Sequence, residues 1–149
     1  KKQISSLIDF GCGKAYYYEN QIKITNTQIK KNLVYDNLLS YWGINDCTLY
    51  DPGVKKYSKY PVKKKDLVIC TDVLEHIPPE DTYNFIKDIF SLANKLVFFV
   101  VHTKPSNKKL SNGKNVHTNL KTIEDWGKIF KSIHNEFRNI EVELKFGDC

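Results

Sequence analysis

Residues 7–15, LIDFGCGKA, combine the residue types of a ligand-binding loop. A mostly apolar run surrounds Asp9, and Gly11 and Gly13 follow in a chain that has only 7 glycines. Glycine adopts backbone angles closed to other residues and lets a ligand approach the main chain closely. The pattern therefore predicts a ligand-binding loop, although a plain tight turn between a strand and a helix would account for it as well.

A second acid strengthens the prediction of a nucleoside site. Asp51 ends another apolar run, residues 47–51, and the chain turns at once through Pro52 and Gly53. A carboxylate at the end of a strand beside a glycine loop can accept hydrogen bonds from both hydroxyls of a ribose. The alternative is an ordinary Asp-Pro-Gly turn.

Groups able to act as general bases follow the later apolar runs. Glu75 and His76 come shortly after one run, His102 ends the next, and His117 lies in the polar loop beyond it. A positioned carboxylate or imidazole can remove a proton from a reacting hydroxyl or amine. The simpler alternative is that Glu75 and His76 only organise the turn after their strand through hydrogen bonds.

These groups require an alternation of strands and helices to hold them. Strands are predicted at residues 5–10, 47–51, 66–70, 95–101 and 139–146, and helices at 14–19, 27–42, 78–93 and from 122 onward. The run LVFFVV, the most apolar of all, predicts a central strand covered on both faces. Alternating strands and helices predict an α/β fold with a mostly parallel sheet, in which ligands bind beyond the carboxyl ends of the strands.

Length and composition limit the classes of protein. The 149 residues predict one domain, spanning 1–149 and long enough to bury a core. No apolar run approaches the roughly 20 residues of a membrane span, so we expect no membrane partner and a cytoplasmic location. The four cysteines show no CxxC spacing and predict reduced side chains with no zinc site; they are Cys12, Cys47, Cys70 and Cys149.

The net charge of +6 is concentrated in two lysine-rich stretches, residues 55–65 and 104–114. Both follow predicted strands on the ligand side, where they could attract an anionic acceptor such as RNA. The interleaved Tyr57 and Tyr60 could stack on a base or a sugar. The alternative is that both stretches are solvated loops.

Nearly the whole chain resembles the class I S-adenosylmethionine-dependent methyltransferases. LIDFGCGKA is similar to the first motif of that family, LYDPG to the acidic motif that holds the ribose, and DLVICTDVLEHI to the fourth-strand motif. VHTNLKTIEDWGKIF is similar to the stretch before the late helix. The loop TKPSNKKLSNGKNVH, together with YDPG and DVLEHIP, is similar to a group of short bacterial and phage-type members.

The resemblance implies a Rossmann-like fold that binds S-adenosylmethionine and releases S-adenosylhomocysteine. It implies a set of cofactor-binding residues, namely Asp9, Gly11, Gly13, Lys14, Asp51, Pro52, Thr71, Asp72 and Val73. From their residue types and their place at the ligand edge, the predicted catalytic residues are Glu75, His76 and His117. Only PGVKKYSKYPVKKK separates the ribose acid from the fourth-strand motif, so we expect the third strand and its helix to be shortened or absent.

The predicted function is methyl transfer to an oxygen or nitrogen of a small-molecule or sugar-containing acceptor. Two alternatives stay open: an RNA methyltransferase, with metal-assisted 2′-O transfer as one form, and an inactive methyltransferase fold that serves as a binding module. The series Asp72-x-x-Glu75-His76 with the distant His117 is similar to the metal-binding arrangement of small-RNA 2′-O-methyltransferases. Relatives carry Glu-His without a metal, and the sequence is assigned no metal ligand.

Overall fold

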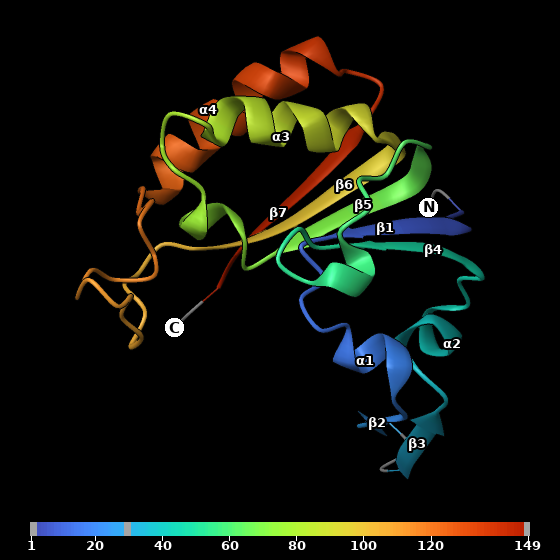
Figure 1. Ribbon diagram of the computed structural model, residues 1–149. Coiled ribbons are helices and arrows are strands. Elements are labelled where there is room, and N and C mark those ends of the chain that lie inside the picture. Colours follow the sequence, from blue (N-terminus) through green and yellow to red (C-terminus); the bar gives the residue numbers. More distant parts are fainter. Residues whose placement is uncertain (1–2, 29–30, 148–149) are drawn as a thin grey trace.

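The protein is described from a computed structural model, which covers residues 3–28 and 31–147. Five parallel strands form the main sheet in the order β4-β1-β5-β6-β7 (Figure 1). They are β1 (Ser6–Phe10), β4 (Asp46–Tyr50), β5 (Lys65–Thr71), β6 (Ala93–His102) and β7 (Glu141–Gly147). The predicted α/β class with a parallel sheet is confirmed, and the arrangement is compatible with a Rossmann-like fold.

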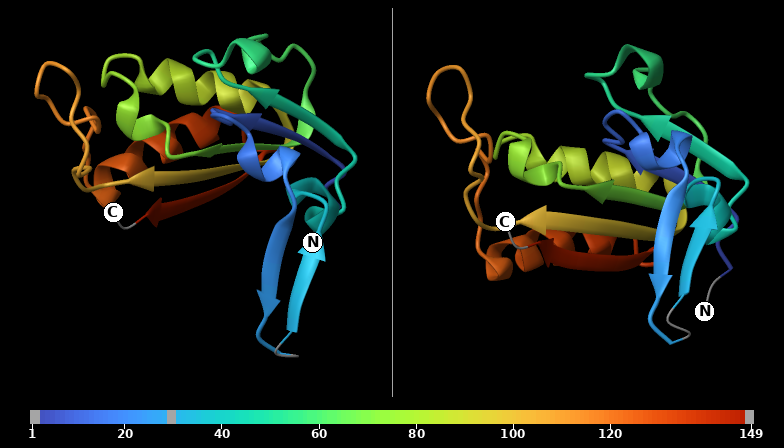
Figure 2. Two further views of the ribbon diagram at one scale, coloured as in Figure 1. Left: turned by 60° about the horizontal axis from the view of Figure 1, so that its bottom comes forward. Right: turned by 90° about the horizontal axis from the view of Figure 1, so that it is seen from below.

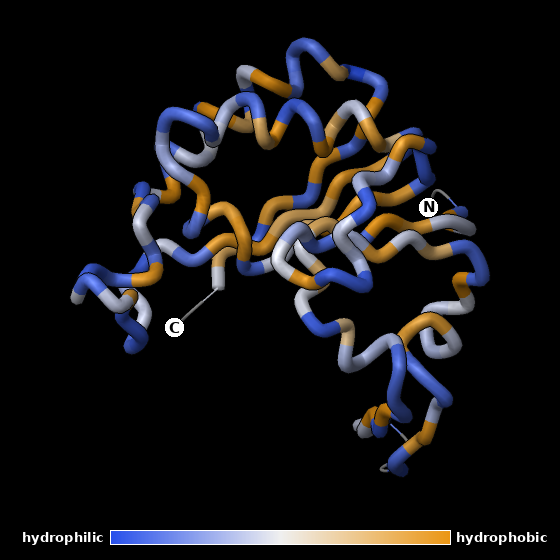
Figure 3. Tube along the Cα trace, viewed as in Figure 1, coloured by the Kyte–Doolittle hydropathy of each residue, from blue (hydrophilic) through white to orange (hydrophobic). Residues whose placement is uncertain are grey.

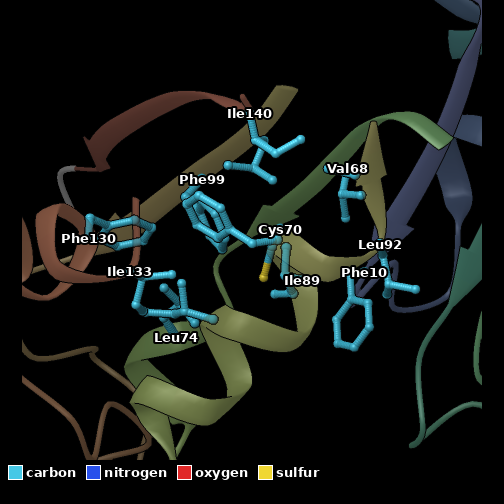
Figure 4. Packing of buried hydrophobic residues seen from close by; sticks show 14 of the residues in the cluster. Phe10, Val68, Cys70, Leu74, Ile89, Leu92, Phe99, Phe130, Ile133 and Ile140 are labelled. Carbon is cyan, nitrogen blue, oxygen red and sulfur yellow. The ribbon is translucent and has the colours of Figure 1, made fainter. Parts of the chain in front are cut away.

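Two long helices, α3 (Thr82–Ser91) and α4 (Ile123–Glu136), cover one face of this sheet (Figure 1). The predicted N-cap of α4 is confirmed, because the Thr122 side chain accepts a hydrogen bond from the Asp125 backbone N–H. Between helices and sheet lies the main core (Figure 4), which includes Ile8, Val68, Cys70, Ile86, Ile89, Phe90, Val97, Phe99, Trp126, Phe130 and Ile133. Hydrophobic residues concentrate in these strands, while residues 103–115 are mostly hydrophilic (Figure 3).

The opposite face of the sheet is only partly covered. The short helices α1 (Tyr16–Glu19) and α2 (Leu38–Trp42) lie on this side, where Leu7, Ile44 and Ile69 form a small buried cluster. Successive residues of a strand point to opposite faces. In β6, Val97 and Phe99 are therefore fully buried, but Leu96 and Phe98 are only half-buried. β6 is an inner strand as predicted, yet the prediction that both of its faces are covered is wrong.

A β-hairpin stands where a helix was predicted over residues 27–42. Strands β2 (Ile22–Asn26) and β3 (Lys31–Tyr35) pair antiparallel and project from the body (Figure 2). Only the end of the predicted helix is helical, as α2, because the Asn37 side chain and Ser40 form a capping box there. Residues 29–30 of the predicted helix lie outside the described residues.

The connection between β4 and β5 is short. Every residue in it is described, and it holds one 3-10 turn, η1 (Lys55–Tyr57), with no strand or α-helix. The predicted loss of the third strand is confirmed, and β4 consequently lies at the edge of the sheet. Across the described part of the chain, every helix is too short or too polar to cross a lipid bilayer.

Candidate active site

Four loops meet at the carboxyl ends of the parallel strands, and backbone hydrogen bonds fix two of them. The N–H groups of Gly11 and Cys12 donate to the carbonyl of Tyr50 at the end of β4, at 2.7 and 3.1 Å. The N–H of Asp72, after β5, donates to the carbonyl of Val100 in β6 at 3.1 Å. The predicted cofactor segments are thus anchored to neighbouring strands.

Glycine is required at position 11 for two reasons: its backbone angle and the lack of space for a Cβ. Its φ of +95° lies in a region that other residues rarely adopt. A Cβ at this position would lie 2.4 Å from Cγ2 of Val73, a distance that no real contact allows. The glycine loop and the segment after β5 therefore touch, as the two predicted cofactor motifs must if they line one site.

The Asp51 carboxylate forms hydrogen bonds both within its own Asp-Pro-Gly turn and to the glycine loop. Its Oδ2 accepts the N–H of Gly13 at 2.9 Å, and its Oδ1 accepts the N–H of Gly53 at 2.8 Å. The Asp-Pro-Gly turn therefore exists, and the same carboxylate also holds the glycine loop. Because each carboxylate oxygen can accept a second hydrogen bond, Asp51 retains capacity for ribose hydroxyls.

A cavity of about 540 Å³ opens between these loops on the side of α3. It is lined by six of the predicted cofactor residues: Gly11, Gly13, Asp51, Pro52, Asp72 and Val73. Four of its seven other lining residues are phenylalanine or tyrosine, and the rest are His76, Ile77 and Asp88. The Tyr60 ring lies 5.3 Å from that of Tyr50 and 5.9 Å from that of Phe10, which in turn contacts Phe85 at 5.4 Å. Sequence analysis anticipated a stacking role for Tyr60 but did not find Phe85.

A second cavity, of about 600 Å³, lies on the partly covered face of the sheet and shares Gly11 with the first. It contains Asp9 and Thr71, two of the three predicted cofactor residues that the first cavity lacks. Lys14 lines neither cavity and is exposed. Tyr16 and Tyr17 also line this cavity and are 64% and 63% exposed.

Asp9 is the most perturbed acid of the site. It is 7% exposed, and its Oδ1 has no hydrogen-bond partner within residues 3–28 and 31–147. Burial raises the pKa of Asp9 to about 6, with the neighbouring Tyr18 hydroxyl lowering it and the charge of Asp51 adding to the increase. A carboxylate held this way is suited to a cationic ligand group.

The thiols near the site are not nucleophiles. Burial, together with the charges of Asp9 and Asp51, raises the pKa of Cys12 to about 12. Complete burial raises the pKa of the Cys70 thiol well above its ordinary value. Both side chains therefore stay protonated at neutral pH, and a cysteine-based covalent step has no support here.

The three predicted catalytic residues come together beside the first cavity. Glu75 and His76 lie in a 3-10 turn, η2 (Leu74–His76), and His117 reaches them from the polar loop after β6. The rings of His76 and His117 are 5.0 Å apart, and ligand atoms of all three residues lie within 4.8 Å of one another. His76 also lines the first cavity.

A second polar pair adjoins this cluster. His102 Nε2 lies 3.0 Å from Asp72 Oδ1, and the His102 ring stacks on that of His117 at 5.5 Å. Asp72 has a φ of +58°, which is unusual for a residue with a side chain. A Cβ on Gly147 would approach His102 to 2.6 Å, so the end of β7 makes room for this ring. Sequence analysis named His102 as a candidate base but did not foresee its partner.

The two lysine-rich stretches differ in the contacts that their side chains make. The side chains of Lys56 and Tyr57 both bond to Glu19 of α1, and Lys65 pairs with Asp46 at 2.5 Å. In the second stretch, Lys108, Lys109 and Lys114 are exposed. Tyr57 is thus occupied by a structural contact, but Lys55, Lys59, Lys63 and Lys64 of the first stretch are exposed too, so both loops keep a basic surface.

Comparison of the chain with protein-family models, with curated proteins and with solved structures finds no match.

Proposed function

We propose that this protein is an S-adenosylmethionine-dependent methyltransferase that acts on an oxygen or nitrogen of a small-molecule or sugar-containing acceptor. One observation carries the proposal: the glycine loop, the acid after β4 and His76 line a single cavity of about 540 Å³ at the carboxyl edge of a parallel sheet. Cavities of this size are typical of small-molecule and cofactor sites. A carboxylate beside a glycine loop suits the ribose of a nucleoside.

The residues present fit the cofactor. Gly13 lines the cavity with open space where a Cβ would lie, and Asp51 keeps free lone pairs beside it. Tyr60 and Phe85 offer an aromatic wall for a planar base, in place of the wall that a third strand would provide. Across the shared Gly11, the Asp9 carboxylate, whose Oδ1 has no hydrogen-bond partner among the described residues, suits the ammonium of the methionine part. When bound, the cofactor supplies the methyl group on a sulfonium.

The chain itself then has to hold the acceptor and accept its proton. His76 Nδ1 lies 2.8 Å from the carbonyl of Val116, and His117 Nδ1 lies 2.7 Å from that of Lys104. Because a carbonyl only accepts hydrogen bonds, both neutral rings carry their proton on Nδ1 and present the lone pair of Nε2. Either Nε2 can receive a proton from an acceptor hydroxyl or amine.

Calorimetric titration with S-adenosylmethionine and S-adenosylhomocysteine tests the proposal. We expect micromolar binding that Asp51→Ala abolishes, because this change removes the ribose acceptor and releases the glycine loop. Asp46→Ala, which removes an exposed acid at the start of the same strand, is the matched control and retains binding. A folded wild-type chain that binds neither compound would overturn the proposal.

RNA is a second candidate acceptor, supported by the exposed Lys108, Lys109 and Lys114 in the loop that carries His117. Contacts with phosphates make affinity fall steeply as salt increases. We expect Lys108→Glu with Lys109→Glu to weaken binding of a single-stranded oligoribonucleotide and to flatten its salt dependence. Binding that ignores both salt and these substitutions would exclude this candidate.

A further inference from the structure

The side chain of Glu75 is buried in a way that calls for a cation. It has no exposed surface, and neither of its carboxylate oxygens has a hydrogen-bond partner among the described residues. Buried carboxylates in proteins are paired, hydrogen-bonded or bound to a metal ion, because an isolated buried charge is costly. The backbone around Glu75 is nonetheless well fixed, since its carbonyl accepts the N–H of Asn119 at 3.0 Å.

Two imidazoles present free nitrogen atoms toward this carboxylate. As described above, backbone carbonyls hold Nδ1 of His76 and of His117, so Nε2 is the atom left to bind a ligand. Histidines that bind metals almost always donate their other N–H to such an acceptor, which fixes the ring and raises its basicity. Because the donor atoms of Glu75 and both histidines lie within 4.8 Å of one another, a single ion can contact all three residues.

We propose that Glu75, His76 and His117 are the protein ligands of a divalent transition-metal ion. Two imidazole nitrogens and one carboxylate, with no thiolate in the set, suit ions such as Mn²⁺, Fe²⁺ and Co²⁺. Asp72 and His102 lie beside the set and bond to each other, and both come within reach of Glu75. Sequence analysis noted that these residues are similar to a metal-binding arrangement but assigned no ligand; the buried Glu75 carboxylate and the two held imidazoles are what support the assignment.

The location of the site gives the ion a role that rests on the proposed function. His76 belongs both to the ligand set and to the wall of the cofactor cavity. Three protein ligands leave coordination positions for oxygen atoms of an acceptor. A bound divalent ion lowers the pKa of a coordinated hydroxyl and orients it. The acceptor class that fits is therefore one with an oxygen, preferably two neighbouring hydroxyls, rather than an amine.

Titration of the cofactor-free protein with Mn²⁺, followed by electron paramagnetic resonance, tests the metal site. We expect one ion per chain, and a loss of affinity of at least about 100-fold in Glu75→Gln and in His117→Ala. His134→Gln is the matched control, because this histidine bonds to the carbonyl of Ile140 and takes no part in the cluster. The control should bind Mn²⁺ like the wild type.

Thermal unfolding with and without Mn²⁺ or Co²⁺ provides a second readout, because an ion that binds only the folded state raises its melting temperature. If Glu75→Gln does not fold, His76→Ala decides, since its side chain is exposed and its loss leaves the core intact. Wild-type protein that binds neither ion, or ligand variants that bind as tightly as the wild type, would overturn the proposal. Because no cofactor is present, this result is independent of the titration with S-adenosylmethionine.

Discussion

The same strands build both faces of the main sheet, but the two faces differ in how they are packed. Toward α3 and α4, Val97 and Phe99 of β6 have no exposed surface. On the opposite side, the alternating residues Leu96 and Phe98 are half-buried and line the cavity that contains Asp9. The covered face supplies most of the buried apolar surface and hence of the hydrophobic stabilisation. The open face leaves room beside the buried carboxylate of Asp9.

The comparison teaches that packing is distributed unequally across one sheet, although a cavity opens on each side of it. The short elements on the open face, α1 and α2, bury little, whereas α3 and α4 bury whole helix faces. The two cavities meet at Gly11, at the end of β1 where the faces join. Substitutions on either side of that junction should therefore have different effects.

Truncating one phenylalanine on each face gives the largest expected difference. Phe99→Ala should lower the free energy of unfolding by about 3–5 kcal/mol, because it leaves a cavity in a fully packed core. Phe98→Ala, its neighbour in the same strand, should cost about 1–2 kcal/mol, because the side chain is only partly buried. Urea unfolding of both variants measures the two values. Equal losses would show that the faces are packed alike.

Adding a methyl group at the junction of the two faces should have a smaller effect on the free energy of unfolding. Gly11→Ala is expected to cost about 2–3 kcal/mol, since it adds an unfavourable φ and a clash with Val73. Gly13→Ala should cost only about 1 kcal/mol, because a Cβ there meets no atom within 4 Å although its φ is also positive. Thermal unfolding and cofactor titration of the pair separate the clash from the backbone effect. Similar losses in both variants would contradict the close packing of Gly11 on Val73.

Removing the buried charge from the open face should stabilise the protein. The pKa of Asp9 rises from 3.8 to about 6 on folding, so the folded state binds the proton more tightly and stability falls as pH rises through this interval. Asp9→Asn should be more stable than the wild type by about 2 kcal/mol at pH 7 and similar to it near pH 4. It should also bind S-adenosylmethionine less tightly. Unfolding curves at several pH values measure the first effect, and a pH-independent difference would refute it.

Removing the helix N-caps on the two faces should give the smallest changes in the free energy of unfolding. Thr122→Ala removes the cap of α4 and should cost about 1 kcal/mol, measured by denaturant unfolding. Asn37→Ala removes the cap of the exposed α2 and should cost about 0.5 kcal/mol. A larger loss from Asn37→Ala would mean that the open face contributes more to stability than its packing indicates.

The sequence predicts the core of the fold well, because its strongest patterns coincide with the best-packed elements. The apolar run of β6 and the Thr122 cap of α4 leave little choice of structure. The predicted helix over residues 27–42 fails where the patterns conflict. Apolar residues there recur at helical spacing, but Ile22 and Ile24 also face Tyr35 and Leu33 across a hairpin. The alternation of apolar and polar residues in Ile-Lys-Ile-Thr, residues 22–25, is the sequence signal for the hairpin. The helical spacing of the apolar residues that follow it is the stronger pattern, and it predicts the wrong structure.

The candidate site divides in the same way. Its motif residues could be located from the sequence, since glycines and acids at strand ends mark a ligand edge. Residues brought in by tertiary packing could not. Phe85 reaches the cavity from a helix, and His102 meets Asp72 because β6 and β5 end side by side. Nothing in the local sequence announces either contact.

The short connection after β4 has one more consequence, for self-association. An edge strand with unpaired backbone groups can recruit a strand from another molecule. Here the segment that follows η1 lies against β4, since Lys59, Pro61 and Lys63 line a common hollow with Thr48 and Leu49. Lysine and proline beside an edge disfavour further strand pairing. We therefore expect the lysines beside β4 to disfavour its pairing with a strand of another molecule, an effect that involves no ligand.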